Sequence, residues 1–224
     1  MSKTFTIYTS SADSSKVLKK NVQIALTVTP ADQSKLFTGD QSPVVWKAWD
    51  FIARSDTTQS ATWVSQPAFA VAGNTSEAIA CNVGNAVVLT TNGLVQGSTL
   101  NPAVQGQQDN VMARNRVNIK QTFLLGSIDG SGTYNPFLRL AATNPNDGAV
   151  TLGPGVKLQA YGVQSGTYAQ PSGDGQLLES TDKGNYIFRT YDGTASPIDL
   201  PGLTNNTTYL LYSNTSGQLV LEAQ

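Results

Sequence analysis

Short stretches in which apolar and polar residues alternate are the feature that most limits the fold of this chain. The clearest one places Val22, Ile24, Leu26 and Val28 on one face, and Pro30 closes it. A period of two is typical of a β-strand, because successive side chains point to opposite faces. Stretches rich in β-branched and aromatic residues recur, and we expect strands at 4–9, 22–28, 44–52, 61–64, 68–72, 86–91, 117–125, 137–142, 156–161, 186–191, 207–212 and 218–222.

Segments rich in Gly, Asn, Asp and Pro separate these stretches, at 129–132, 144–148, 153–155 and 214–217. These residues supply positive φ or fix a bend, so the segments predict turns. Ser42-Pro43 also permits a helix through residue 53, but the Val and Trp content there favours a strand. Short strands separated by such turns predict an all-β protein, most simply an antiparallel β-sandwich.

A faint internal repeat suggests that the sandwich contains two related β-units. Segments 21–30, 61–73 and 88–92 resemble segments 135–145, 149–162 and 210–214, in the same order. This duplication predicts a first unit over 1–97 with an insertion at about 31–56, a connecting segment over 98–116, and a second unit over 117–224. The alternative is one continuous domain.

A Trp-rich stretch carries a resemblance to known proteins. It reads Val-Val-Trp-Lys-Ala-Trp over 44–49, and Thr-Trp-Val over 62–64 and Phe-Ala-Val-Ala-Gly over 69–73 follow it. Together with the opening alternation, this pattern resembles small bacterial and fungal β-proteins of the RhiA-like kind over about residues 1–165. The resemblance implies a two-copy β-sandwich without assigned chemistry, and no functional residue is carried over from it.

Charge is scarce in this chain. Charged residues make up 13% of the 224 residues, against about 25% in an ordinary soluble protein. Hydrophobic residues, at 39%, are not in excess, and the formal net charge is −1. The surface is therefore rich in hydroxyl and amide groups, and a net charge near zero favours association. Without an excess of basic residues, we expect no nucleic-acid partner.

Histidine is absent and Cys81 is the only cysteine. This composition excludes Ser-His-Asp and Cys-His nucleophile systems and removes the commonest ligands of zinc, copper and iron. We therefore expect no enzyme activity, no catalytic residue, no metal and no cofactor. Cys81 is interpreted as a small buried hydrophobe, with a reactive thiol or an intermolecular bridge as the alternatives.

The acidic residues show no pair whose spacing points to catalysis. Asp174, Glu179 and Asp182 lie in one loop-rich region and are interpreted as solvated loop acids. Residues 129–132 contain Asp and Gly, but the oxygen ligands and final Glu of an EF-hand loop are missing. A tight hairpin turn is the preferred interpretation of that segment.

Basic residues form two small clusters, Lys16, Lys19 and Lys20, and Arg114, Arg116 and Lys120. Each is interpreted as an ordinary solvated face, with contact to an anionic headgroup or a phosphate as the alternative. Neither cluster has the interleaved aromatic residues that stack on bases.

We expect a soluble, non-catalytic structural protein that self-assembles through strand edges into a homo-oligomer or a larger assembly. The terminal strands at 4–8 and 218–222 are the expected edges. Their candidate assembly contacts are Phe5, Ile7, Tyr8, Leu219 and Leu221. On this hypothesis, deleting residues 1–8 abolishes assembly and leaves a folded monomer.

One alternative is an enzyme of the two-carboxylate kind, although no acid pair stands out. Two others remain open. One is a lectin-like module in which Trp46, Trp49 and Tyr161 stack on a glycan, although tryptophans of a sandwich are more often core. The other is a membrane-active β-rich toxin. The chain has no apolar stretch of transmembrane length, and residues 1–8 do not read as a signal peptide. We therefore expect it in the cytoplasm, or exported without a visible signal.

Overall fold

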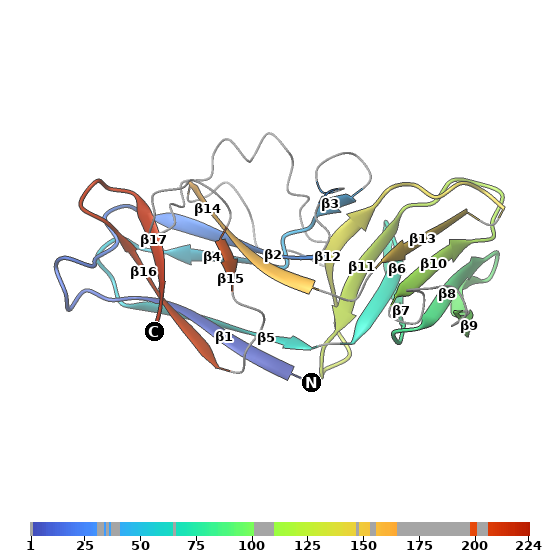
Figure 1. Ribbon diagram of the computed structural model, residues 1–224, viewed down its shortest axis with the longest axis horizontal. Helices are drawn as coiled ribbons and strands as arrows, with labels where there is room; N and C mark the ends of the chain where they lie inside the picture. The colour runs from blue at the N-terminus through green and yellow to red at the C-terminus, as the bar shows by residue number, and fades with distance from the viewer. Residues whose placement is uncertain are drawn as a thin grey trace.

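Figure 1 presents the computed structural model. It describes residues 2–30, 34, 36, 41–64, 66–100, 110–146, 148–152, 156–164, 198–200 and 206–224. Every regular element within these ranges is a β-strand, which confirms the all-β prediction. Residues 44–53, where a helix was the alternative, contain a strand instead.

Four strands from the N-terminal part of the chain and four from the C-terminal part form one unit, here called the terminal unit (Figure 1). Its sheet I has the spatial order β17 (Leu219–Ala223), β16 (Thr207–Ser213), β1 (Ser2–Thr9) and β5 (Thr57–Val64). Its sheet II has the order β15 (Ile198–Leu200), β14 (Val156–Gln164), β2 (Val22–Pro30) and β4 (Lys47–Phe51).

The middle of the chain supplies most of a second unit, here called the middle unit, which lies beside the first (Figure 1). Its sheet III has the order β3 (Gln41–Pro43), β12 (Tyr134–Leu140), β11 (Phe123–Ile128), β6 (Pro67–Val71) and β7 (Asn74–Ala80). Its sheet IV has the order β13 (Gly148–Leu152), β10 (Val111–Asn115), β8 (Asn85–Thr90) and β9 (Gly93–Thr99).

The two units are not the two halves of the sequence. Each of the four sheets contains strands from both halves, since β1 pairs with β16 and β2 pairs with β14 across nearly the whole chain. The predicted division into units 1–97 and 117–224 therefore does not match the way the strands are shared among the sheets. The expected connecting segment, 98–116, contains the strand β10. Short alternating strands resemble one another, so similarity between segments does not reveal which strands pair.

Strand β2 shows how position in a sheet changes burial. Val22 to Val28 alternate as the sequence predicts, but Gln23 and Thr27 on the opposite face are also buried, with 2% and 0% of their surfaces exposed. β2 lies between β14 and β4, and both faces of sheet II are covered at this point. The buried Gln23 amide donates a hydrogen bond to Asp50 Oδ1 at 3.1 Å, so its burial does not leave it unpaired.

Two of the predicted turns connect neighbouring strands as hairpins. Residues 129–132 join β11 to β12, and residues 214–217 join β16 to β17. Gly132 and Gly217 have φ of +85° and +78°, which is the conformation that favours glycine. The predicted turn at 153–155 and the predicted strand at 186–191 lie outside the described residues, as do Asp174, Glu179 and Asp182.

Candidate functional site

A row of aromatic side chains runs through the core from the terminal unit into the middle unit. The ring of Phe5 lies 5.6 Å from that of Trp49 and 5.9 Å from that of Trp46. Trp46 meets Trp63 edge-on at 5.5 Å, and Trp63 lies 5.1 Å from Phe137 on β12. Because Phe137 belongs to sheet III and the other four to the terminal unit, the row ties the units together.

The candidate glycan-binding residues are buried in the structure. Trp46 and Trp49 are each 5% exposed, and Tyr161 is 1% exposed, with its hydroxyl donating to Gln159 Oε1 at 2.8 Å. Stacking on a sugar needs an accessible ring face. The structure therefore places these three aromatic side chains in packing positions.

The candidate assembly contacts on β1 are also internal. β1 pairs with β5 on one side and with β16 on the other, so the expectation that residues 4–8 form an edge is wrong. Phe5 and Ile7 are buried, and Tyr8 is half-buried. The sequence shows the alternation of β1 but not the strands that flank it.

β17 does lie at an edge of sheet I, as expected. Leu219 is buried and Leu221 packs against the core, so neither is an accessible contact. Glu222 on this edge accepts from Lys16 Nζ at 2.9 Å, and that hydrogen bond holds the pKa of the Glu222 carboxyl below its ordinary value.

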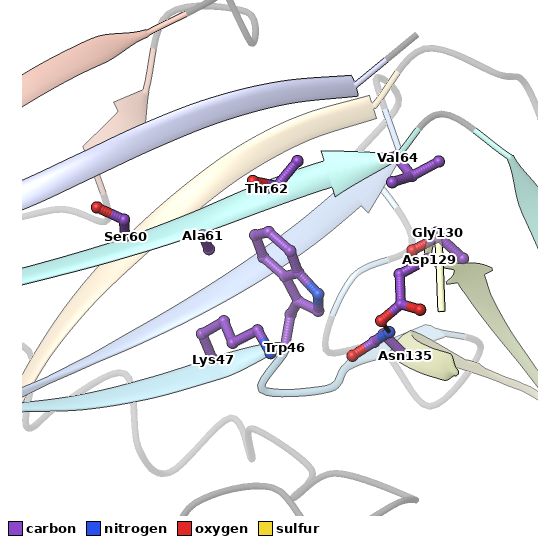
Figure 2. Close-up of a pocket in the computed structure, with 10 residues that line it drawn as sticks. Trp46, Lys47, Ser60, Ala61, Thr62, Val64, Asp129, Gly130 and Asn135 are labelled. Carbon is purple, nitrogen blue, oxygen red and sulfur yellow. Dashed lines mark hydrogen bonds between the residues drawn. The ribbon is translucent and has the colours of Figure 1, made fainter. Parts of the chain in front are cut away.

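A cleft of about 300 Å³ opens where the two units meet (Figure 2). Residues of β5, the start of β4 and the β11–β12 hairpin line it. In this view the indole of Trp46 lies between Lys47 and the Asp129–Asn135 pair. Lys47 Nζ lies 5.8 Å from the centroid of the Trp46 ring, within range of a cation–π contact.

The polar groups of this cleft already have partners within the protein. Asp129 Oδ1 accepts from the Ser131 hydroxyl at 2.6 Å and from the backbone N–H groups of Ser131 and Thr133 at 2.9 and 3.0 Å. Its Oδ2 accepts from Asn135 Nδ2 at 3.2 Å. The Ser131 hydrogen bond is the main cause of the lowered pKa of the Asp129 carboxyl. Asp129 therefore stabilises the predicted hairpin turn through these hydrogen bonds.

Hydroxyls on the β5 side of the cleft are paired in the same way. Ser60 Oγ lies 2.9 Å from Thr6 Oγ1, and Thr62 Oγ1 lies 2.9 Å from Thr4 Oγ1, both across the β1–β5 pair. A polar ligand in the cleft would compete with these bonds rather than satisfy unpaired groups.

Strand edges differ in how well they are protected against pairing. Charged residues and proline on an edge discourage a further strand from adding to it. Among the edges whose side chains are described, four carry such a residue: Pro43 on β3, Lys47 and Asp50 on β4, Glu77 on β7 and Glu222 on β17. The edges β5, β9 and β13 carry none. Sheet IV therefore has two unprotected edges, β9 and β13.

Exposed apolar side chains gather around the same sheet. The exposed large hydrophobic residues of the described chain are Ile52, Val83, Val95 and Ile119. Val95 lies on β9, Val83 in the turn before β8, and Ile119 shortly after β10. Only Ile52 belongs to the terminal unit. Three of these four exposed residues therefore lie in segments that form or adjoin sheet IV.

Cys81 is buried, in agreement with its interpretation as a small buried hydrophobe. Its side chain is fully buried, its thiol donates to the Asn85 carbonyl at 3.3 Å, and burial raises its pKa. Within the described ranges, no three acidic, cysteine or histidine side chains gather closely enough to hold a metal ion. The same ranges contain no helix that could span a membrane.

Comparison with protein-family models, curated proteins and solved structures finds no match to this chain. The RhiA-like resemblance consequently stays a prediction.

Sequence reasoning missed β9 and β13 as edge strands. β9 reads Gly-Leu-Val-Gln-Gly-Ser-Thr, in which two glycines and few apolar residues hide the strand pattern. A signal was present nonetheless, because Asn92-Gly93 after an apolar run is typical of a hairpin turn.

Proposed function

We propose that this protein is a non-catalytic structural protein that assembles with copies of itself through the edges of sheet IV. The observation that carries the proposal is that sheet IV ends on both sides in strands without charge or proline, β9 and β13. An edge of this kind offers unpaired backbone N–H and C=O groups to another strand. The proposal moves the assembly contact from the terminal strands to the middle unit.

The exposed side chains near this sheet and the low charge support the same proposal. Val95 is 41% exposed on β9, where pairing would cover it. A net charge of −1 leaves little long-range repulsion between copies.

Strand directions limit the geometry of such a contact. β9 is antiparallel to β8, β8 is parallel to β10, and β10 is antiparallel to β13. β9 and β13 therefore run in the same direction. A head-to-tail contact would pair β9 with β13 of the next copy in parallel and would give a filament or a ring, whereas a two-fold axis would pair one edge with itself and give a dimer.

Edge lysines test the proposal. Val95→Lys on β9 and Thr151→Lys on β13 each place a charge at an exposed edge position. Ser76→Lys on the already charged edge β7 is the matched control, since Ser76 is also exposed. Light scattering gives the mass of each variant, and circular dichroism verifies that it is folded.

Each outcome has a defined meaning. Loss of assembly in both edge variants indicates head-to-tail pairing of β9 with β13. Loss in only one indicates that this edge pairs with itself. A wild-type protein that stays monomeric at high concentration, or an assembly that neither edge variant weakens relative to Ser76→Lys, contradicts the proposal.

A further inference from the structure

Arg114 is half-buried and Arg116 is exposed, so the expected solvated face describes Arg116 but not fully Arg114. They line a groove of about 530 Å³ across the outer face of sheet IV, between β8, β9 and β10. Lys120, the third member of their sequence cluster, is exposed and is not among the lining residues. The groove is separate from the cleft between the units, but β9, an edge strand of sheet IV, forms one side of it.

Register explains why the groove has an apolar floor beneath the arginines. Val88 pairs with Arg114 on one side and with Val95 on the other, so the three side chains lie in a row on the same face of the sheet. Val87 and Leu89, which point the opposite way, are in the core. Arg114 thus has Val88 beside it on the same face of the sheet.

Gly97 keeps the floor of the groove low. A Cβ at this position would lie 2.9 Å from the Ala86 carbonyl oxygen and 2.9 Å from Val88 Cγ2. The next residues, Ser98 and Thr99, are exposed and bring hydroxyl groups to the rim. The groove therefore combines guanidinium groups, hydroxyls and small apolar side chains.

The charged residues that line the groove, among those the structure describes, are all basic. The described lining residues include two arginines and no aspartate or glutamate, in a chain whose acids outnumber its Lys and Arg residues by 15 to 14. Guanidinium groups bind carboxylate and sulfate oxygens through paired, charge-assisted hydrogen bonds. The lining contains no aromatic side chain on which a nucleobase would stack.

We propose that this groove binds an acidic saccharide, with Arg114 and Arg116 holding its carboxylate or sulfate groups. Serine and threonine hydroxyls at the rim suit the hydroxyls of a sugar, and the valine floor suits its C–H face. Arg116 directly follows the last residue of β10, and its backbone N–H donates to the Leu89 carbonyl at 3.0 Å, so both arginines lie beside β8. Two arginines in one groove can engage separate anionic groups of one saccharide chain. The two arginines lie outside the edge strands, whereas Val95 on β9 belongs both to the floor of the groove and to the edge contact proposed above.

Three polysaccharides serve as probes: a polyuronate, a sulfated polysaccharide and a neutral glucan. Affinity is measured by isothermal titration calorimetry for the wild type, Arg114→Gln, Arg116→Gln and the control Lys120→Gln, which removes the same charge outside the groove. We expect binding of at least one acidic polymer, no binding of the glucan, and about a tenfold loss for each arginine variant, because a charge-assisted hydrogen bond of this kind contributes about one decade in affinity. Lys120→Gln should bind as the wild type does.

The two acidic arms identify the anionic group, since binding of only one of them assigns carboxylate or sulfate. Failure to bind either acidic polymer overturns the proposal. It is also overturned if Lys120→Gln loses as much affinity as the arginine variants, or if duplex DNA binds as tightly as the acidic polysaccharides, because either result indicates general attraction of polyanions. Light scattering of Arg114→Gln should show the wild-type assembly state, which separates failure of this site from failure of the edge contacts.

Discussion

The rings of Trp63 and Phe137 lie 5.1 Å apart with their planes inclined at 59°, and this contact joins sheet I of the terminal unit to sheet III of the middle unit. Both side chains are nearly fully buried, at 5% and 2% exposed. A single hydrophobic cluster includes both of them and extends through strands of all four sheets. The two units therefore share one core rather than holding two separate ones.

A shared core predicts cooperative unfolding. We expect one thermal transition, seen at the same temperature by tryptophan fluorescence and by circular dichroism. In a double-mutant cycle, Trp63→Leu and Phe137→Leu should be non-additive by about 0.5–1.5 kcal/mol, since an aromatic pair contributes roughly that much beyond its buried area. Two separated transitions, or strictly additive effects, would show that the units are energetically independent.

Gly126 on β11 has no room for a side chain. A Cβ there would press against the Asn135 carbonyl oxygen and the Tyr134 ring on the partner strand β12. We expect Gly126→Ala to lower the free energy of unfolding by about 1–3 kcal/mol, as overpacking does. Gly130→Ala in the adjoining turn is the control, because a Cβ there meets nothing within 4 Å. Urea unfolding compares the two, and equal stability of both variants would contradict the close approach.

The Asp129 carboxylate should make the β11–β12 hairpin sensitive to acid. Its pKa in the folded protein is lower than the ordinary value of 3.8, mainly because it accepts from the Ser131 hydroxyl. The stability that this carboxylate contributes to the fold is therefore fully present above about pH 3.8 and is lost as the pH falls through the lowered pKa. Asp129→Asn should cost about 1–2 kcal/mol at pH 7.

The measurement is urea unfolding of Asp129→Asn at pH 7 and in acid, alongside the wild type and the exposed edge variant Glu77→Gln. The difference in the free energy of unfolding between the wild type and Asp129→Asn should narrow in acid, and Glu77→Gln controls for the removal of a carboxylate outside the hairpin. A difference that stays constant with pH would indicate that the hydrogen bonds of the turn do not depend on the charge.

Removal of residues 1–8 should destroy the fold rather than release a folded monomer. The deletion takes away β1, which supplies Phe5 and Ile7 to the core and lies between β5 and β16. We expect loss of the near-ultraviolet circular dichroism and of the thermal transition. A truncated protein with wild-type spectra would contradict the central position of β1.

The sequence predicts strands well where apolar alternation is strong and poorly where strands are polar. Val22 to Val28 and the aromatic alternation before Thr9 both correspond to strands of the structure. The strand expected at 117–125 begins only at Phe123, because residues 116–120 are mostly exposed. β7 and β10 were missed, since one is largely polar and the other does not alternate.

Long-range pairing is the part that local patterns do not contain. Nothing near Thr6 indicates that its neighbour in the sheet is Thr208, and the assignment of β1 as an edge failed for that reason. The surroundings of the candidate site residues depend on this long-range pairing as well. The tryptophans are core because flanking strands cover them, and the proposed role of Arg114 depends on its pairing with Val88, which pairs in turn with Val95.

Backbone amide hydrogen exchange at low and high protein concentration tests the central claim most directly, because pairing at an edge protects the amides of that edge. The account predicts that β9, β13 or both exchange more slowly as concentration rises, while the amides of the charged edge β7 exchange at an unchanged rate. Exchange of β9 and β13 that does not depend on concentration, in a protein whose mass by light scattering does, would place the assembly contact elsewhere and contradict the account.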